Sequence, residues 1–214
     1  MPEQAPNVQR MMSDIEWALA HDLPASELVP MLNKLLRHAE PDSRAALFGK
    51  RKLAELIVQD QPWKSALLAR QLLKAERASG EPDERTWALL GLAQTLLGHY
   101  RAAAAAYRQA MVLAPHFPMC AHNLGHLLDV ALNRPGDALK YLEQAYAAFP
   151  NEPEIGSSYA HALVRAGQHS RAKTVLADAL DGDASAAEHL LAEWLRSDPP
   201  GAPLRLACSE QRSR

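Results

Sequence analysis

The pattern that most constrains this chain begins in the segment 86–115, where small and helix-ending residues stand at the spacing of two antiparallel helices. Gly91 and Ala103 are small enough to let the two backbones approach to the usual ~8–10 Å between helix axes. Gly98 can end the first helix because glycine adopts a left-handed conformation at no steric cost, and Pro115 can end the second because proline cannot continue it. The segment therefore predicts a helix-turn-helix unit that cannot bury its own apolar face.

This unit recurs twice along the chain with a period of about 34 residues. Leu124 and Gly125 stand one period after Leu90 and Gly91, and the second copy is one residue longer, which we place in the turn 133–137. The third copy contains Tyr159, Ala160, Gly167, Ala172, Leu176 and Ala179. Because stacked copies bury each other's apolar faces, the recurrence predicts a solenoid.

The order of residues within a copy resembles the tetratricopeptide repeat (TPR). The first copy carries the resemblance through Trp87, Leu90, Gly91, Gly98, Tyr107, Ala110 and Pro115. Gln94 stands where that repeat usually has a tyrosine. The resemblance implies an all-α fold, a right-handed α-solenoid of about ten or eleven helices. Its three TPR repeats would occupy residues 82–117, 118–152 and 153–184.

Helical periodicity outside the repeats assigns the rest of the chain. Residues 8–81 are predicted to form an N-terminal helical region that includes a degenerate TPR-like hairpin. Residues 185–197 are predicted to form a helix that caps the end of the solenoid. We expect disorder at residues 1–7 and 198–214, which have few side chains able to pack.

Composition limits the classes of function. The chain has 214 residues, a formal net charge of −2 and no run of lysine and arginine, which argues against nucleic acid as a partner. No apolar stretch approaches the ~20 residues needed to span a bilayer, and the N-terminus is unlike a signal peptide, so no membrane association is expected. Cys120 and Cys208 do not make a disulfide framework, which favours a reduced, cytoplasmic location. No enzyme motif is found, and we expect neither catalysis nor a cofactor.

One face of the first helix of each repeat is expected to line the concave side of the solenoid. If Trp87 and Leu90 pack against the partner helix, the helical period of 100° per residue places a second stripe on the opposite side. In TPR proteins that stripe lines the groove in which ligands bind. The expected groove residues are Arg85, Ala88, Leu92, Thr95, Met119, His122, Asn123, His126, Asp129, Glu154, Ser157 and His161.

Three histidines stand out in this predicted groove. His122 and His126 share a helix face, Asp129 follows one turn later, and His161 takes the place of His126 in the next repeat. The favoured interpretation is that they are solvated residues available for hydrogen bonding. One alternative is a metal site made by His122, His126, Asp129 and His161, and another is a pH-sensitive contact of the imidazoles with Asp129 or Glu154.

These features together predict a non-catalytic protein–protein interaction scaffold or adaptor that holds a peptide or a partner helix in its groove. Ala88 and Leu92 stand where the TPR clamp for a chaperone's terminal carboxylate has Lys and Asn, which argues against that ligand. A secretion or assembly chaperone, a metal- or pH-responsive regulator, and a subunit that assembles through its own helices are the alternatives. The sequence predicts no particular oligomeric state.

Tryptophan and cysteine positions add expectations about packing. Trp63, Trp87 and Trp194 lie on apolar stripes, so they are predicted to anchor the core. Trp17 lies off the apolar stripe of its helix and is a candidate for an exposed contact residue. Cys120 is expected to behave as a small, inert apolar residue.

Overall fold

A computed structural model describes residues 7–180 and 182–197 of the chain. In these residues there are eleven α-helices, one π-helical segment and no strand, so the all-α fold predicted from the repeats is confirmed. None of these helices is both long enough and apolar enough to cross a membrane. Of the two segments predicted to be disordered, 1–7 and 198–214, only Asn7 is described, and its side-chain oxygen accepts the N–H of Arg10 and so caps helix Val8–Ala20. The helices divide into two units, residues 1–99 and 100–214, and each unit is described by itself.

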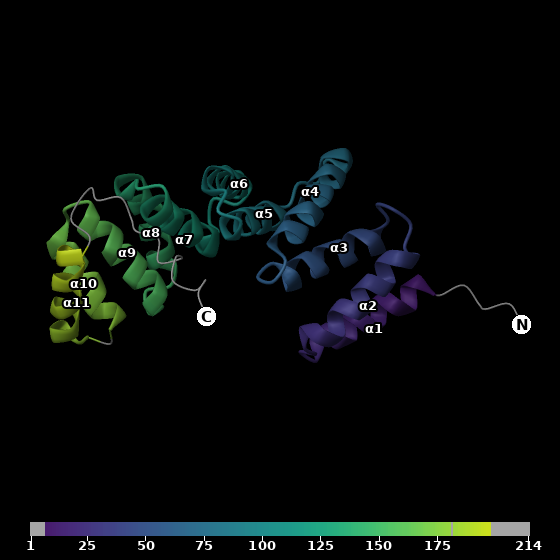
Figure 1. Cartoon of the computed structure of the whole chain (residues 1–214), viewed down its shortest axis with the longest axis horizontal. Helices are drawn as coiled ribbons and strands as arrows, with labels where there is room; N and C mark the ends of the chain where they lie inside the picture. The colour runs from purple at the N-terminus through teal and green to yellow at the C-terminus, as the bar shows by residue number, and fades with distance from the viewer. Residues whose placement is uncertain (1–6, 181, 198–214) are drawn as a thin grey trace, which may run out of the picture. The chain divides into compact units, whose positions relative to one another are not determined.

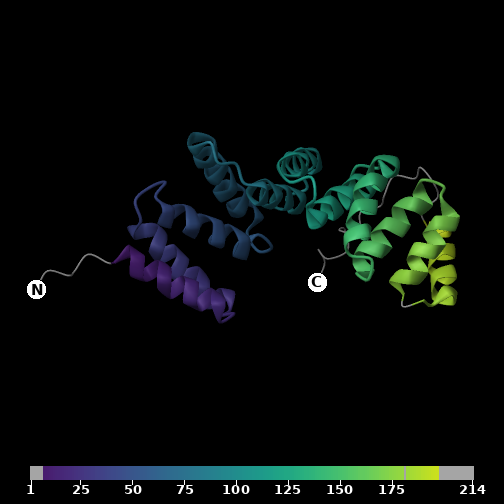
Figure 2. The ribbon, with the colours of Figure 1, turned by 180° about the vertical axis from the view of Figure 1, so that it is seen from behind.

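The first unit contains the helices α1 to α5 (Figure 1). They span Val8–Ala20 (α1), Ala25–His38 (α2), Arg44–Ile57 (α3), Pro62–Ser79 (α4) and Glu84–Leu96 (α5). Each of the helices α1 to α4 packs against the helix that follows it in the chain, and the view from behind shows the same succession (Figure 2). The bounds of α1 are those predicted from its apolar periodicity.

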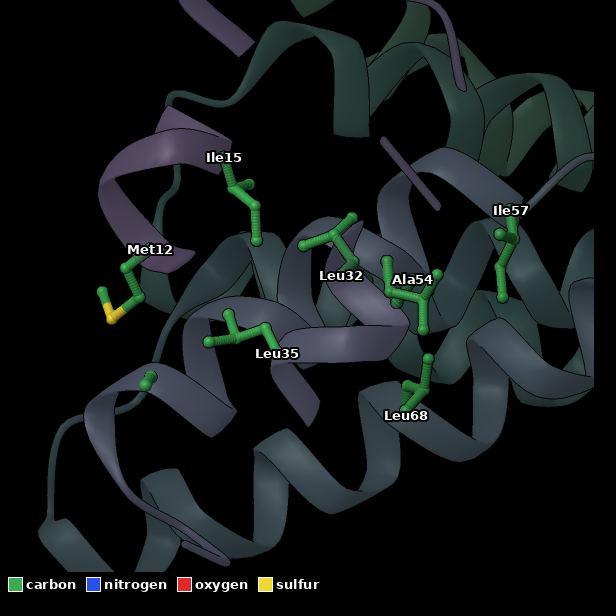
Figure 3. Close-up of a cluster of buried hydrophobic side chains, with 9 residues drawn as sticks. Met12, Ile15, Leu32, Leu35, Ala54, Ile57 and Leu68 are labelled. Carbon is green, nitrogen blue, oxygen red and sulfur yellow. The ribbon is translucent and has the colours of Figure 1, made fainter. Parts of the chain in front are cut away.

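The core of the first unit is made of aliphatic side chains from α1 to α4 (Figure 3). Ile15, Leu32 and Leu35 are fully buried where α1 meets α2. The whole cluster comprises Met12, Ile15, Leu32, Leu35, Ala45, Leu53, Ala54, Ile57 and Leu68. Full burial of one such large side chain contributes ~1.5–3 kcal/mol. Because isolated helices of this length are marginal in water, this shared core stabilises them.

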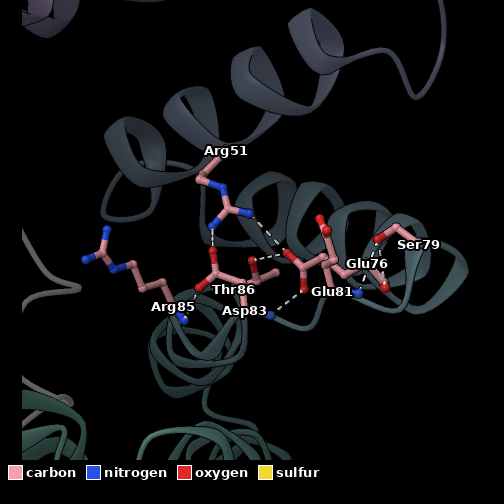
Figure 4. A network of polar contacts seen from close by, with 7 residues as sticks. All are labelled: Arg51, Glu76, Ser79, Glu81, Asp83, Arg85 and Thr86. Atoms are coloured by element: carbon pink, nitrogen blue, oxygen red, sulfur yellow. Dashed lines mark hydrogen bonds and ion pairs between the residues drawn. The ribbon is translucent and has the colours of Figure 1, made fainter.

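A polar network joins α3, α4 and the start of α5 (Figure 4). Nη2 of Arg51 donates to Oε1 of Glu76 at 3.1 Å, and Nη1 donates to the carboxylate of Asp83. Oε1 of Glu76 also accepts the hydroxyl of Thr86 at 2.6 Å. Oδ1 of Asp83 accepts the backbone N–H of Arg85 at 2.8 Å and so caps α5. The network therefore determines where α5 begins and holds it against the preceding hairpin.

The second unit contains the helices α6 to α11 and the π-helical segment η1. They span Tyr100–Leu113 (α6), Pro118–His126 (α7), Leu127–Ala131 (η1), Pro135–Ala148 (α8), Pro153–Arg165 (α9), His169–Ala179 (α10) and Ala184–Ser197 (α11). Helices α7 and α8 form one antiparallel pair and α9 and α10 another, with α8 against α9 (Figure 1). Helix α11 packs on α10 and α9, which is the position that a capping helix requires.

Small residues mark the place where α7 and α8 cross. A Cβ added at Gly125 would lie 2.6 Å from Cγ of Leu142, so the backbones are too close for a side chain at this position. Ala138 of α8 is fully buried. The crossing predicted for the second repeat is therefore confirmed. The equivalent contact between Gly91 and Ala103 would join the two units, and it stays a prediction.

The extra residue of the second copy lies in its first helix, so its predicted place in the turn is wrong. Residues Leu127–Ala131 form a π-helical segment, which holds about one residue more per turn than an α-helix, and the N–H of Leu132 donates to the carbonyl of Leu127 at 3.0 Å. Asn133 then adopts a left-handed φ of 53°, as Gly167 does with φ 78° in the third copy. A buried alanine stands five residues after each of them, so the two turns have the same length.

The tryptophans do not all take the predicted positions. Trp63 is 62% exposed, so the prediction that it anchors the core is wrong. Leu67, one turn later on α4, is also exposed, so this face of the helix packs on no other helix of the first unit. Trp87 and Trp194 are half-buried, and Trp17 is exposed as its position off the apolar stripe predicted.

Replacing Gly125 by Ala is expected to destabilise the protein, because the added Cβ would overlap Leu142. Overpacking of this kind costs ~1–3 kcal/mol. Gly136→Ala, in the first turn of α8, is the matched control: nothing lies within 4 Å of a Cβ there, and we expect no loss of stability or a gain of ~0.4–1 kcal/mol. Urea unfolding measures the stability of both variants. Equal unfolding midpoints for the Gly125→Ala and Gly136→Ala variants would contradict the close crossing of α7 and α8.

Candidate functional site

The predicted groove residues divide between the two units. Arg85, Ala88, Leu92 and Thr95 belong to α5 of the first unit, and the others belong to α7, η1 and α9 of the second. A single groove that includes residues of both units therefore stays a prediction. Within the second unit, α7 and α9 contact each other and bring the predicted residues of two repeats together.

Ser158 of α9 connects the two histidines of α7. Its hydroxyl oxygen lies 3.1 Å from Nε2 of His122 and 3.3 Å from Nδ1 of His126. His122 is only 5% exposed, whereas His126, at the edge of the same face, is exposed. Because a hydroxyl can donate one hydrogen bond and accept others, Ser158 can serve both imidazoles and tie α7 to α9.

A buried ion pair joins η1 to α9. Asp129 is 1% exposed, and Nη1 of Arg165 donates to its Oδ1 at 2.8 Å and to its backbone carbonyl oxygen at 2.5 Å. Oδ2 of Asp129 accepts Nδ1–H of His161 at 2.6 Å. Nη2 of Arg165 donates to Oδ1 of Asn133. These charge-assisted bonds offset the cost of removing the carboxylate and the guanidinium from water.

Helix α11 extends this arrangement from the C-terminal side. The ring of Trp194 meets the ring of His161 edge to face, with centroids 5.3 Å apart. The side chain of His161 is therefore only 18% exposed. The helix predicted as a cap thus contributes a side chain to the candidate site.

Two of the predicted groove residues are not solvated. His122 and Asp129 are buried against α9, so the interpretation of the whole set as solvated hydrogen-bonding residues is wrong for these two. The physical reason is that Ser158 and Arg165 supply partners inside the protein. The contact of an imidazole with Asp129, which the pH-sensitive alternative requires, is present at His161.

The side chains that a partner could reach lie at the edge of this network. Met119 is 49% exposed, His126 and Glu154 are exposed, and Asn123 and Ser157 are half-buried. We name the surface made by these five residues the histidine face. It combines an apolar thioether, an imidazole, a carboxylate and two neutral hydrogen-bonding groups.

Three residues of the network were missed by sequence reasoning, namely Asn133, Ser158 and Arg165. Arg165 stands four residues after His161, so helical spacing could have indicated that both reach the same acid. Asn133 had a weaker signal, because asparagine is one of the few residues that tolerates a left-handed turn. Ser158 had none, since its role depends on how α9 lies on α7.

Burial lowers the pKa of both histidines of α7 below the ordinary value of 6.5. For His122 burial is the largest cause, the nearby His126 lowers the pKa further, and Glu154 partly opposes the shift. For His126, burial of part of the ring is again the largest cause even though its edge is exposed; Asp129 and Glu154 oppose the shift and His161 adds to it. Both imidazoles are therefore neutral at neutral pH.

The geometry does not favour the metal-site alternative. Within residues 7–180 and 182–197, no three His, Cys, Asp or Glu side chains are grouped so that they could hold a metal ion. Both oxygens of Asp129 already accept hydrogen bonds from Arg165 and His161. His122 and His126 each direct a ring nitrogen at the hydroxyl of Ser158, which occupies the point that the two imidazoles share.

Cys120 of α7 is a packing residue, as predicted. It is 2% exposed, and its thiol donates to the carbonyl oxygen of Tyr107 at 3.6 Å. Burial raises the pKa of the thiol to about 12, so the reactive thiolate is scarcely populated near neutral pH. Cys208 lies outside the described residues.

Replacing Asp129 by Ala is expected to destabilise the protein by ~3 kcal/mol or more, because it leaves the guanidinium of Arg165 buried without its counter-ion. Asp137→Ala is the matched control, since the Arg134–Asp137 pair is exposed and such pairs contribute about 0–1 kcal/mol. Urea unfolding measures both free energies. A loss at Asp129 no larger than that at Asp137 would show that the buried pair does not support the fold.

Stability is expected to fall as the pH drops below about 6.5, the ordinary histidine pKa, because the unfolded chain then binds protons that folded His122 and His126 bind less readily. The contribution of these lowered pKa values is fully present above that pH and is lost as pH falls through the folded-state values. Melting temperatures between pH 7.5 and pH 5.5 measure the effect. A His122→Asn, His126→Asn double variant should show a smaller fall, and an identical fall would assign the pH dependence to other groups.

Two segments of the chain match the tetratricopeptide repeat family, at residues 84–117 and 129–192. The first match includes α5 and α6, and the second runs from η1 into α11. A search of curated proteins finds no match to this chain.

Several solved structures are similar to this chain. A crystal structure of MamA protein is 16% identical with a TM-score of 0.66, and the likeness covers 85% of this chain and 94% of that one. A MamA chain from Desulfovibrio magneticus RS-1 is 13% identical with a TM-score of 0.69, covering 83% and 96%. YrrB, described as a TPR protein with an unusual peptide-binding site, is 14% identical with a TM-score of 0.64, covering 89% and 92%.

At such low identity these likenesses show the fold alone, an α-solenoid of helical hairpins. The second match contains the antiparallel pair α9 and α10, whereas α7 and Gly125 lie between the two matches. Residues 84–117 and 129–192 of this chain are therefore tetratricopeptide repeats.

Proposed function

We propose that the protein is a non-catalytic scaffold or adaptor whose histidine face binds a peptide or a helix of a partner protein. Its TPR repeats support a role as a protein–protein interaction scaffold in general. The observation that carries the finer proposal is the exposure of Met119, His126 and Glu154 above a layer of hydrogen-bonded side chains. Burial lowers the pKa of His126, and the nearby charge of Glu154 partly opposes that shift, so residues of α7 and α9 present one surface.

The network beneath the histidine face supports the proposal through preorganisation. His122 and His126 share the hydroxyl of Ser158, and Asp129 is held by Arg165 and His161. Side chains that are already ordered lose little conformational entropy when a ligand arrives. The face would therefore bind without the rearrangement that a set of freely rotating side chains requires.

The composition of the histidine face suits a peptide more than a small charged ligand. The thioether of Met119 adapts its shape to apolar side chains. The half-buried amide of Asn123 can donate to and accept from a peptide backbone, and His126 and Glu154 add one imidazole and one carboxylate at the edge. Such a mixture favours a partner with an apolar anchor and polar groups around it.

The contact of Ser158 with His122 has the distance of a nucleophile and its base, yet its surroundings favour a structural role. Ser158 lies in the middle of α9, where backbone N–H groups bind carbonyl groups of the same helix. Hydrolytic catalysis by a serine requires N–H groups that stabilise an oxyanion, and the N–H groups around Ser158 are not available for this role. This supports the proposal that the protein binds without catalysis.

Replacing Met119, His126 and Glu154 together by Ala is expected to weaken partner binding by ~2 kcal/mol or more, the cost of truncating residues at the centre of an interface. Because the three side chains are exposed, stability should change by less than ~1 kcal/mol. Affinity capture from the source cells with the full chain as bait identifies the partner. Isothermal titration with the purified partner then measures the affinity of each variant.

The control replaces Arg101, Arg108 and Lys140, exposed residues of α6 and α8, by Ala. It alters the same number of side chains outside the histidine face and should leave binding intact. If the control abolishes binding and the Met119, His126 and Glu154 variant does not, the partner binds elsewhere and the proposed site is wrong.

A further inference from the structure

Helix α4 carries a row of exposed side chains that the core of the first unit does not use. Trp63, Leu67, Arg70, Lys74 and Arg77 follow one another at intervals of three or four residues, so they lie along one face of the helix. Trp63 is 62% exposed and Leu67 is 49% exposed, and the three basic residues are exposed as well. We name this row the α4 stripe. One end of it is apolar and the other is basic.

The positive charge of the α4 stripe is not neutralised by an ion pair within the described part of the chain. Among the residues that the structure describes, no carboxylate forms an ion pair with Arg70, Lys74 or Arg77. Glu76, the nearest acid in the sequence, is already bonded to Arg51 and Thr86 (Figure 4). A local positive patch therefore stands on a chain whose formal net charge is −2.

A cavity of about 520 Å³ opens between α4 and α5 beside the basic end of the stripe. Leu73, Trp87 and Leu90 contribute apolar walls. The three basic residues of the stripe also line the cavity, together with Glu76, whose carboxylate is bonded to Arg51 and Thr86. Its size lies within the ~300–1,000 Å³ of ordinary ligand pockets. The cavity can therefore accept one or two large apolar side chains next to three cations.

We propose that the α4 stripe and this cavity bind an amphipathic helix of a partner protein that carries a row of acidic residues. Carboxylates spaced three and four residues apart on the partner would face Arg70, Lys74 and Arg77, which have the same spacing. Apolar side chains of the partner would enter the cavity and cover Trp63 and Leu67. Charge complementarity thus requires a partner with negative charge, and the apolar surface of the stripe and cavity requires that the partner helix also has an apolar face.

The dimensions of the surface match a helix. The stripe runs from Trp63 to Arg77, about 21 Å at 1.5 Å per residue, which is about four turns of a partner helix. Rows of apolar and charged residues along one helix face, with a partly apolar cavity at one end, can hold the anchoring side chains of an amphipathic helix. An extended peptide would lack an exposed strand edge to pair with, since the described residues contain no strand.

This surface is independent of the histidine face. All residues of the stripe and of the cavity belong to the first unit, and the histidine face belongs to the second. Failure of one proposal therefore says nothing against the other.

The test measures binding of a fluorescent helical peptide of about 15 residues to the full-length chain by anisotropy. The peptide has leucines on one face, flanked by glutamates at spacings of three and four. Its controls are a scrambled peptide of the same composition and a peptide with lysine in place of glutamate. Two stripe variants are compared, Trp63→Ala with Leu67→Ala, and Arg70→Glu with Lys74→Glu and Arg77→Glu. Arg101→Glu with Arg108→Glu and Lys140→Glu is the charge-matched control on the second unit.

We expect saturable binding of the acidic helical peptide, a loss of about tenfold or more in both stripe variants, and no loss in the charge-matched control. Equal binding of the scrambled peptide would overturn the proposal, because it would show attraction to any polyanion. The absence of binding, or affinity unchanged in both stripe variants, would also overturn it. Light scattering tests whether a second copy of this chain is the occupant: a dimer that the stripe variants dissociate would replace the proposed partner.

Discussion

Close approach of neighbouring helices is the constraint on which the rest of this structure depends, and small residues make it possible. Gly125 leaves no room for a Cβ beside Leu142 where α7 meets α8, and Gly156 stands in the same way against Ala179 where α9 meets α10. At such distances each helix fills the surface of the next, and the many small dispersion contacts add up. The same close packing explains why no single hairpin is expected to be stable by itself, since a neighbouring hairpin covers the apolar face of each one.

Close packing also determines how polar residues are arranged between the helices. A carboxylate between η1 and α9 is stable only with partners, and Asp129 has them in Arg165 and His161. The π-helical segment accommodates the extra residue of this repeat in the helix, so the turn at Asn133 keeps the length found at Gly167. Asn133 in turn accepts a hydrogen bond from Arg165, so the local irregularity and the buried ion pair stabilise each other.

The two proposed surfaces differ in what supports them. The histidine face stands on a buried polar network, and only the outer edge of that network is available to a partner. The α4 stripe lies over an apolar core. Its apolar side chains are exposed, and its basic side chains form no ion pair with the described residues. A scaffold with both surfaces would hold two partners of different chemistry, one through preorganised polar contacts and one through an acidic helix.

The sequence by itself determined the helices, the tetratricopeptide repeats at residues 84–117 and 129–192, and the crossing at Gly125. Helical periodicity predicted the helix at residues 8–20, because the spacing of apolar residues within a helix is encoded in nearby residues. The repeat period from Gly91 to Gly125 predicted the second crossing, because the same short pattern recurs in each repeat. The position of each residue within the helical period also placed His122, His126 and His161 on helices that contact each other. The candidate site was predictable to this extent, because helical periodicity assigns a residue to a face.

Only the tertiary structure decided which side chains of a face are buried. Trp63 lies on an apolar stripe and is nevertheless exposed, because no other helix of the first unit covers that side of α4. Asp129 was expected in solvent and is buried, because Arg165 reaches it from a helix 36 positions along the chain. Burial depends on neighbours that are distant in sequence. The helical period determines which residues share a face of a helix. Tertiary packing determines whether that face contacts another helix or solvent.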